Sequence, residues 1–480
     1  MQRRDLLKSG LALTSLAAAG QSGPAGAQPA GIANPAKLRK NVSQLLPNSP
    51  DLNLYRQAVQ LLKGLNATDP RNWTRLAEVH QTYCPHRNWW FLPWHRAYLW
   101  YFEQTCRDVL QNPDFCLPYW DWTRAQRIPA PFWEGSLHNA TRQITPNDPI
   151  SSEFVGPAVI TRIMDASANI TLYSGSTTSD DQRETSAQGT LEATPHNMVH
   201  GTIRGDMGSF MSPLDPIFWL HHANVDRIWA SWARGASNRF PAEPLWGNHL
   251  LASFFDPVQK KQVSPKTVDT LDAAKWGAEY DRYESSSIKP AQNLPAAAFV
   301  FGAASNNVLA ASKLGRNFFS TDAVAISKPL ALNKSLKLAV PVNAELTQVL
   351  ESMSTPPPVD RAAPEATLVL EGVPAPKVKT SVLRVFLNCK NPSVNTPIDD
   401  ASYVGTVGFF SHGGPGHAVH NKSDFALDIG PTLHKLTAAG QYDPAAPVDV
   451  ALVAVDAQAP GKLSTGEVLK PERVRIVGVN

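Results

Sequence analysis

Seven of the 13 histidines in this 480-residue chain lie in two short blocks whose spacing is typical of metal ligands. The first block holds His80, His86 and His95. Three neutral imidazoles that meet at one point form a good site for copper or zinc. A single histidine in such a place would be interpreted as a core or loop residue, so the prediction depends on the group.

The second block combines two histidines one helical turn apart with a histidine pair. His196 and His200 stand at positions i and i+4, on one face of a helix. His221 and His222 are neighbours in the sequence. Because adjacent helical residues point about 100° apart, we expect only one of this pair to bind a metal. Asp226 follows His222 by one turn and is suitably placed for a supporting contact.

Two helices and a loop are needed to gather the first block. Pro93 suits the first turn of a helix, and residues 94–110 are good helix formers with apolar side chains at steps of three and four. We therefore expect His95 to project from the first turn of this helix. His80 then lies near the end of the preceding helix, and His86 lies on the loop between the two.

The ligand types favour a pair of copper ions. Hydrolytic sites with two zinc ions usually have Asp or Glu bridging the metals, and neither block offers an obvious candidate. Ligation by imidazole alone suits copper that cycles between Cu(I) and Cu(II). Two such ions about 3.5–4 Å apart could hold O₂ between them.

Both blocks resemble the signatures of the tyrosinase and polyphenol oxidase (catechol oxidase) family of type 3 dicopper proteins. One block reads His86-x4-Phe-Leu-x-Trp-His95-Arg-x2-Leu-x3-Glu103, and the other reads Asp215-Pro-x-Phe-Trp-x2-His222-x3-Asp226. The resemblance implies two copper ions. It also implies which histidines bind each ion: His80, His86 and His95 the first, and His196, His200 and His222 the second. His221 is then the neighbouring non-ligand.

The resemblance also gives roles to smaller features. Cys84 and His86 are similar to the family's Cys-x-His, which implies a thioether between the sulfur and the imidazole ring; a plain buried thiol is the alternative. Glu192 and Asn197 fall where related enzymes hold a water that deprotonates a monophenol, although Glu192 also suits the first turn of a helix. Ser209 falls at the position of a gating side chain.

The implied activity is oxidation of o-diphenols to o-quinones with O₂, together with hydroxylation of monophenols. An o-aminophenol or catechol-only oxidase shares every motif and remains an alternative. An O₂ carrier or copper-storage protein is an alternative from another class. The expected partners are a small phenolic substrate and O₂, and assembly into a homo-oligomer is left open. Lys and Arg number 44 and Asp and Glu 41, which argues against a nucleic-acid partner.

Residues 1–27 have the three parts of an export signal: a charged start, a short apolar run and a small-x-small cleavage site. Arg3-Arg4 resembles a twin-arginine signal, which predicts a periplasmic or secreted protein. The apolar run is too short to span a bilayer, so we expect no membrane association after its removal. The mature charge would then be near +1, since the net charge of +3 loses three basic residues and one acidic residue.

Composition divides the rest of the chain, because all 13 tryptophans lie between Trp73 and Trp276. We expect a mainly α catalytic domain with a four-helix-bundle dicopper centre and long loops at 28–290. A Pro/Ala-rich connector would follow at 291–360, with partial pairing to the following sheet left open, and an all-β C-terminal sandwich domain at 361–480. Runs of β-type residues occur at 367–370, 382–387, 404–410, 448–455 and 474–479.

The C-terminal domain resembles the lid of latent plant and fungal enzymes, which inserts a side chain over the copper site. Phe409 or Phe410 is the candidate plug. In the segment that closes the catalytic domain, the plant Tyr-x-Tyr reads Ala278-Glu279-Tyr280, so the hydrogen bonds of the first tyrosine are in doubt.

The remaining cysteines and histidines carry weaker expectations. A Cys106–Cys116 disulfide is feasible after export, with two buried thiols as the alternative, and Cys389 is expected in the core of the tail. Three more histidines lie in a Gly-rich loop and could catch copper in transit, although an exposed polar loop is the simpler interpretation: His412, His417 and His420.

Overall fold

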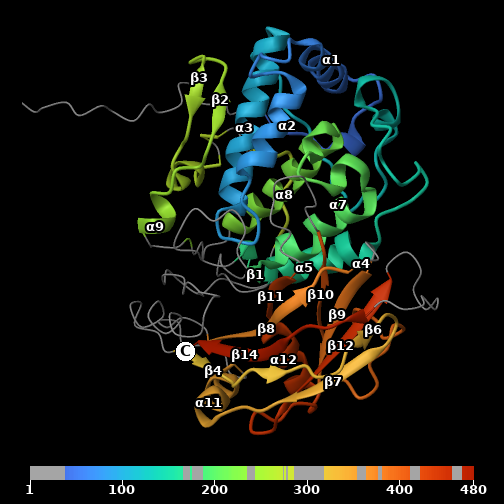
Figure 1. Ribbon diagram of the computed structural model, residues 1–480, viewed down its shortest axis with the longest axis vertical. Coiled ribbons are helices and arrows are strands. Elements are labelled where there is room, and N and C mark those ends of the chain that lie inside the picture. Colours follow the sequence, from blue (N-terminus) through green and yellow to red (C-terminus); the bar gives the residue numbers. More distant parts are fainter. Residues whose placement is uncertain are drawn as a thin grey trace, which may run out of the picture.

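The computed structural model places a helical domain against a sheet-rich C-terminal domain (Figure 1). It describes residues 38–165, 173–175, 187–234, 240, 244–273, 275–276, 279–285, 318–353, 364–376, 381–410, 422–456 and 468–479. The export signal predicted at 1–27 and the loop with His412, His417 and His420 lie outside the described residues.

Two long helices, α3 and α8, form the centre of the helical domain. The α-helices are α1 (Pro50–Gly64), α2 (Trp73–Tyr83), α3 (Phe91–Leu110), α4 (Ser152–Val155), α5 (Pro157–Asp165), α7 (Asn197–Ile203), α8 (Ile217–Ala233) and α9 (Pro244–Gly247). A π-helical turn, η4 (Glu192–His196), leads directly into α7. Short 3₁₀ turns are η1 (Val42–Gln44), η2 (Ala130–Trp133), η3 (Gly135–Leu137), η5 (Gly205–Gly208), η6 (Ser212–Leu214) and η7 (Thr267–Thr270). A small hairpin of β2 (Phe254–Asp256) and β3 (Lys261–Val263) packs beside α3.

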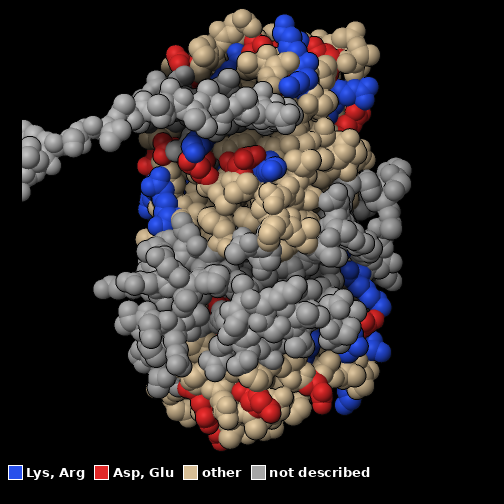
Figure 2. Space-filling model, turned by 90° about the vertical axis from the view of Figure 1, so that its left-hand side faces the viewer, with Lys and Arg blue, Asp and Glu red and all other residues tan. Residues whose placement is uncertain are grey.

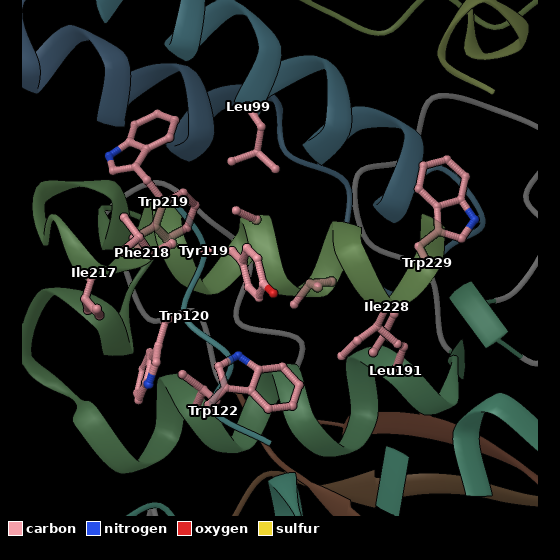
Figure 3. Close-up of a cluster of buried hydrophobic side chains, with 14 of the residues drawn as sticks. Leu99, Tyr119, Trp120, Trp122, Leu191, Ile217, Phe218, Trp219, Ile228 and Trp229 are labelled. Atoms are coloured by element: carbon pink, nitrogen blue, oxygen red, sulfur yellow. The ribbon is translucent and has the colours of Figure 1, made fainter. Parts of the chain in front are cut away.

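The central helix α8 combines large apolar residues with buried polar residues that have partners. It is buried from Ile217 to Trp232, and Asp226 and Arg227 form buried ion pairs. Figure 3 shows Phe218 and Trp219 at one end of α8 and Trp229 near the other, with Leu99 of α3 above. Every tryptophan except Trp133 is buried. The tryptophan-rich part of the sequence is thus the core that surrounds the histidines.

The C-terminal domain contains two main sheets. The larger has the order β1-β11-β8-β14-β4, with β5 also paired to β14, and the smaller has the order β10-β9-β12-β7. Their strands are β1 (Ala187–Gln188), β4 (Phe318–Ser320), β5 (Val324–Ala325), β7 (Ser335–Val340), β8 (Glu365–Pro374), β9 (Ser381–Leu387), β10 (Tyr403–Gly408), β11 (Lys422–Asp428), β12 (Val448–Asp456) and β14 (Arg473–Val479). A minor pair joins β6 (Leu330–Ala331) to β13 (Val468–Leu469). All pairs are antiparallel except β1 with β11.

The description of this domain as all-β was wrong in detail, because α11 (Ala344–Ser352) and α12 (Gly430–Ala438) pack against its strands. Part of the segment 291–360 pairs with the sheets, since β4 pairs with β14 and β7 pairs with β12. The chain therefore enters the C-terminal sheets by Phe318, well before residue 361.

The smaller sheet has one face in the sandwich and the other against the helical domain. All seven residues of β9 are buried. Leu383 and Val385 belong to the core between the sheets, whereas Val382 and Phe386 join the core of the helical domain. Successive side chains of a strand point to opposite faces, so the two domains share one continuous apolar contact.

Polar contacts also cross the interface between the domains. Arg384 donates from two nitrogens to the Glu153 carboxylate, with distances of 2.5 and 2.6 Å. Arg162 of α5 donates to the carbonyl oxygens of Val404 (2.9 Å) and Ile398 (3.3 Å). The cation of Arg162 also lies 4.3 Å from the centre of the Tyr403 ring. These contacts fix the C-terminal domain to the face from which η4 and α7 arise.

The four cysteines all lie in the described part of the chain, and none is joined to another in a disulfide. Of the two alternatives left open for Cys106 and Cys116, the structure therefore has the two free thiols. Cys106 is buried in α3, whereas Cys116 is partly exposed and lies 4.0 Å from Nη2 of Arg107.

The described helices include none long and apolar enough to cross a bilayer. On the face in Figure 2, the described Lys, Arg, Asp and Glu side chains lie interspersed.

Candidate metal centre

The structure brings the six predicted histidines together from four α-helices, the π-helical turn η4 and one loop. His80 lies in the last turn of α2, His86 follows on the loop, and His95 lies in α3. His196 ends η4, His200 lies in α7 and His222 in α8. Ring nitrogens of His80, His95 and His222 lie within 4.8 Å of one another, as do those of His196, His200 and His222. The ring centres of His86 and His95 are 5.5 Å apart.

Hydrogen bonds fix which nitrogen of four rings carries the proton. Nδ1 of His80, His95 and His200 lies 2.7, 2.7 and 2.6 Å from the backbone oxygens of Phe210, Phe91 and Met207 respectively. A carbonyl oxygen only accepts, so Nδ1 must donate, and the lone pair of each neutral ring lies on Nε2. Nδ1 of His196 lies 3.0 Å from Oδ1 of Asn197 in the same way.

The nitrogens that carry the lone pairs fit a metal. Nε2 of His95 and Nε2 of His196 are buried and have no hydrogen-bond partner among the described residues. Nε2 of His200 and Nε2 of His222 lie 3.4 Å apart. Buried polar atoms without partners are rare, and a metal ion at this point would take up the lone pairs of these nitrogens. The donor set of imidazoles alone suits copper.

Burial keeps these rings neutral. Removal from water lowers the pKa of His95 to about 3 and the pKa of His200 to about 4. Burial and the neighbouring imidazoles lower the pKa of His196 and of His222 well below the usual value. Metal ligands must be unprotonated, so the protein keeps these side chains in the form that binds metal at neutral pH.

His221 lies among these rings but has the opposite tautomer. Its ring nitrogen is within 4.8 Å of those of His196, His200 and His222. However, Nε1 of Trp122 donates to Nδ1 of His221 over 3.1 Å. An indole N–H can only donate, so it occupies the lone pair of Nδ1, and the proton of His221 lies on Nε2. His221 therefore has no lone pair left for a metal in this arrangement.

Buried ion pairs join the helices that carry the ligands. Arg96, next to His95, donates to Asp226 of α8 over 2.7 Å, and its cation lies 3.7 Å from the centre of the Trp229 ring. Tyr280 also donates to Asp226, over 2.7 Å, and Arg39 donates to Glu103 over 3.1 Å. Asp226 thus holds α3 and α8 together. Tyr280 is the tyrosine of the plant Tyr-x-Tyr motif that this chain keeps, and it still makes this hydrogen bond.

Cys84 lies beside the ring of His86. Its sulfur is 3.5 Å from Nδ1 of His86, and both residues are buried. The sulfur also lies within 4.8 Å of a ring nitrogen of His80.

Glu192 and Asn197 are buried beside the second triplet. Both carboxylate oxygens of Glu192 accept from the backbone N–H of Arg87, each over 3.0 Å. Arg87 follows His86 and has a positive φ of 58°, so Glu192 supports the strained loop that carries His86. Asn197 contacts His196 through Oδ1. The sequence did not reveal the contact with Arg87, because a backbone N–H has no signature in the sequence.

Ser209 lies in a turn beside the site, and the next residue faces the histidines. The Ser209 hydroxyl donates to the Asp206 carbonyl over 3.0 Å and accepts from the N–H of Met211 over 3.1 Å. The ring of Phe210 lies 6.0 Å from that of His86 and 6.4 Å from that of His80. In this turn it is therefore the side chain of Phe210, the residue after Ser209, that faces His80 and His86.

Phe410 of the C-terminal domain covers the histidines. Its ring stacks on that of His200, with centroids 4.5 Å apart and an interplanar angle of 29°. It also lies 6.1 Å from the ring of His196 and 6.4 Å from that of His86. Phe409, the other candidate, instead packs on Phe425 inside its own domain, with centroids 5.5 Å apart.

Comparisons with known proteins agree with this geometry. The common central domain of tyrosinase matches residues 70–157 and 133–235, which include all six histidines. A tyrosinase of Hahella sp. (strain CCB-MM4) is 26% identical over 469 residues, which cover 85% of this chain and 93% of the relative. A chloroplastic polyphenol oxidase of Spinacia oleracea is 29% identical, but the match covers 52% of this chain and about half (47%) of the relative.

The fold agrees with that of latent plant enzymes over both domains. The structure of latent apple tyrosinase aligns with a TM-score of 0.68 and 23% identity, covering 94% of this chain and 99% of the other. Latent aurone synthase aligns with a TM-score of 0.64 and 20% identity, covering 93% and 91%. The signatures, the six gathered imidazoles and these matches lead to one conclusion: residues 70–235 match the common central domain of tyrosinase, and the chain resembles the tyrosinase and polyphenol oxidase family, whose members carry a type 3 dicopper centre.

Proposed function

We propose that the protein is a dicopper oxidase that uses O₂ to convert o-diphenols to o-quinones. Six buried imidazoles gathered at one place, four of them with a fixed tautomer, are the observation that carries this proposal. His80, His86 and His95 would hold the first copper, and the other triplet, His196, His200 and His222, would hold the second. When bound, the copper pair supplies O₂ binding and two-electron redox chemistry. α2, α3, α7 and α8 would then act as a four-helix bundle around the metals.

The ring of His86 is further fixed by a thioether to Cys84. The sulfur lies 3.5 Å from Nδ1 of His86, so a ring carbon next to that nitrogen is within reach after a small movement. The new C–S bond replaces one S–H and one C–H bond, and O₂ takes up the two electrons and two protons. Mass spectrometry of the His86 peptide, which loses two hydrogens, tests this bond.

Hydroxylation of monophenols also belongs to the proposal, with Glu192 and Asn197 as the residues that handle the substrate proton. A phenol has a pKa near 10 and must lose its proton before it binds copper as phenolate. Glu192 is buried four residues before His196 and is the carboxylate that we assign to this role. Phe210, beside His86, replaces Ser209 as the proposed gate.

The C-terminal domain is proposed to keep the enzyme latent. The ring of Phe410 stacks on a copper ligand, where an incoming phenol ring would have to lie. The predicted twin-arginine signal adds periplasmic or secreted localisation to the proposal, and a homo-oligomer stays open.

Copper content and substrate oxidation test the proposal together. We expect two coppers per chain, a new near-ultraviolet band when peroxide is added, and quinone from catechol under air after the C-terminal domain is removed. Fewer than two coppers in active protein would contradict the assignment. Oxidation of catechol without oxidation of tyrosine would favour the catechol-only alternative, and absence of quinone from every diphenol would favour the O₂ carrier.

A further inference from the structure

A two-residue strand of the helical domain is part of the C-terminal sheet. β1 pairs in parallel with β11, with Ala187 opposite Asp424 and Gln188 opposite Phe425 (Figure 1). The side chain of Gln188 is buried and returns to the helical domain. There its Oε1 accepts a hydrogen bond from Nδ2 of Asn197 over 2.6 Å. Gln188 therefore contacts the C-terminal domain through its backbone and the metal centre through its side chain.

Every polar atom of the Asn197 amide has a partner, and the partners fix its orientation. Nδ2 also donates to the backbone oxygen of Gly408 over 3.1 Å. A carbonyl oxygen cannot donate, so the amide atom that faces it must be the nitrogen. Oδ1 then faces Nδ1 of His196, which must donate to it. The lone pair of His196 consequently lies on Nε2, the buried atom available to the metal.

The second acceptor of Asn197 comes from the C-terminal domain at a point of very close approach. Gly408 ends β10, and a Cβ at this position would collide with the sulfur of Met198. Glycine lets the strand come this near, with its carbonyl in reach of Asn197, without a shift of the Met198 side chain. When the C-terminal domain leaves, this acceptor leaves with it, and Gln188 is the acceptor that belongs to the helical domain.

We propose that Gln188 is a positioning residue for the second copper. Its side-chain oxygen holds the Asn197 amide in the orientation that directs Nε2 of His196 toward the metal, and its backbone links this hold to the docked C-terminal sheet. The inference depends on the proposed function, because it takes His196 as a copper ligand. Residues that orient a metal ligand in this way typically change metal affinity by about 10- to 100-fold when altered.

Substitutions that remove or keep the acceptor test the role in the full-length holoprotein. Gln188→Met keeps the length of the side chain without an acceptor, and Gln188→Asn keeps an amide that is too short to reach. Gln188→Glu keeps an oxygen at the same place. We expect the Gln188→Met and Gln188→Asn variants to lose one of their two coppers to a chelator about tenfold faster than wild type. The rate of copper loss from the Gln188→Glu variant should stay within about twofold of the wild-type rate.

Several outcomes would overturn the inference. The first is copper loss from folded Gln188→Met or Gln188→Asn at the wild-type rate. The second is copper loss from Gln188→Glu as fast as from Gln188→Met, which would indicate that Gln188 acts through packing. Thermal melting of each variant establishes that it is folded, and the Asn variant serves if the Met variant does not fold. If wild type itself binds fewer than two coppers, the proposed function fails. If wild type binds two and the variants match it, only this inference fails.

Discussion

The ring of Phe410 lies on the ring of His200, with centroids 4.5 Å apart and nearly parallel planes. The two residues come from different domains, and β10 ends at Gly408, directly before Phe409 and Phe410. A phenol that approaches the second triplet has to displace this ring. The contact therefore connects the position of a whole domain to access at one imidazole.

Replacing Phe410 with Ala should raise oxidation of catechol by the full-length protein. We expect about a tenfold increase in kcat/KM, since removal of the ring opens the site while the domain interface stays in place. Phe409→Leu is the matched control, because Phe409 packs on Phe425 and not on a histidine. The initial rate of quinone formation is the measurement. Equal activity of wild type and Phe410→Ala would show that this ring does not block the substrate.

Cleavage between Met353 and Pro364 should not release the C-terminal domain. β7 and β4 precede the cut and pair with β12 and β14 after it. The two pieces should elute together in size-exclusion chromatography under native conditions, with low activity. A chain truncated after Ser285 should instead oxidise catechol without activation. Separation of the nicked pieces would contradict the pairing.

The histidine positions could be predicted because a helix gives fixed spacings. His196 and His200 share a face by their separation of four, and the two family signatures contain His86, His95 and His222. The side chains that set the tautomers could not be predicted. Trp122 is 99 positions from His221, and Gly408 is 211 positions from Asn197, so only the tertiary fold brings either pair together.

The same reason explains the missed parts of the C-terminal domain. β7 lies at the edge of its sheet and is mostly exposed or half-buried, so its sequence lacks the apolar run of a central strand. β11 begins at Lys422 and contains Asp424 and Asp428, which weaken its strand signal. In contrast, the strands that were predicted, β8, β9, β10, β12 and β14, are buried over most of their length.

Glu192→Gln should separate the two activities. The Gln oxygen still accepts from the N–H of Arg87, so the loop that carries His86 should keep its conformation. The variant loses a carboxylate that could take a proton. We expect hydroxylation of tyrosine to fall about 100-fold, with oxidation of catechol within about threefold. Glu134→Gln, on the exposed surface, is the control. An equal fall in both activities would indicate a structural role for Glu192.

Trp122→Phe should alter the metal centre without removing the metals. Loss of the indole N–H lets His221 move its proton to Nδ1 and present a lone pair from Nε2, so it can compete as a fourth nitrogen ligand. We expect two coppers per chain, catechol turnover lowered about tenfold, and a changed absorption spectrum after substitution with cobalt. Trp120→Phe is the control, because its indole donates to the Ala125 carbonyl. An unchanged cobalt spectrum in Trp122→Phe would exclude the proposed role of this indole.

Glu284 should make the stability of the protein depend on acid pH. Its carboxylate accepts from Arg124 over 2.7 Å and from Arg227 over 2.9 Å. Burial alone would raise its pKa, but the hydrogen bonds and charges of the two arginines outweigh burial and lower the pKa to about 2. Between pH 4.5 and 2 the unfolded chain binds this proton and the folded chain does not. The free energy of unfolding therefore decreases as the pH is lowered through that window.

The matched variant is Glu284→Gln, compared with wild type by urea unfolding of the two metal-free proteins at a series of pH values. At pH 7 we expect the variant to be less stable by about 1–2 kcal/mol, after allowance for screening by solvent. The difference should narrow as the pH falls from 4.5 toward 2, because wild type then loses the charge that the variant never had. Glu78→Gln, in an exposed pair with Arg75, should show almost no difference at any pH. A gap between wild type and Glu284→Gln that stays constant across this window would mean that the ionised carboxylate is not what holds Arg124 and Arg227 in place.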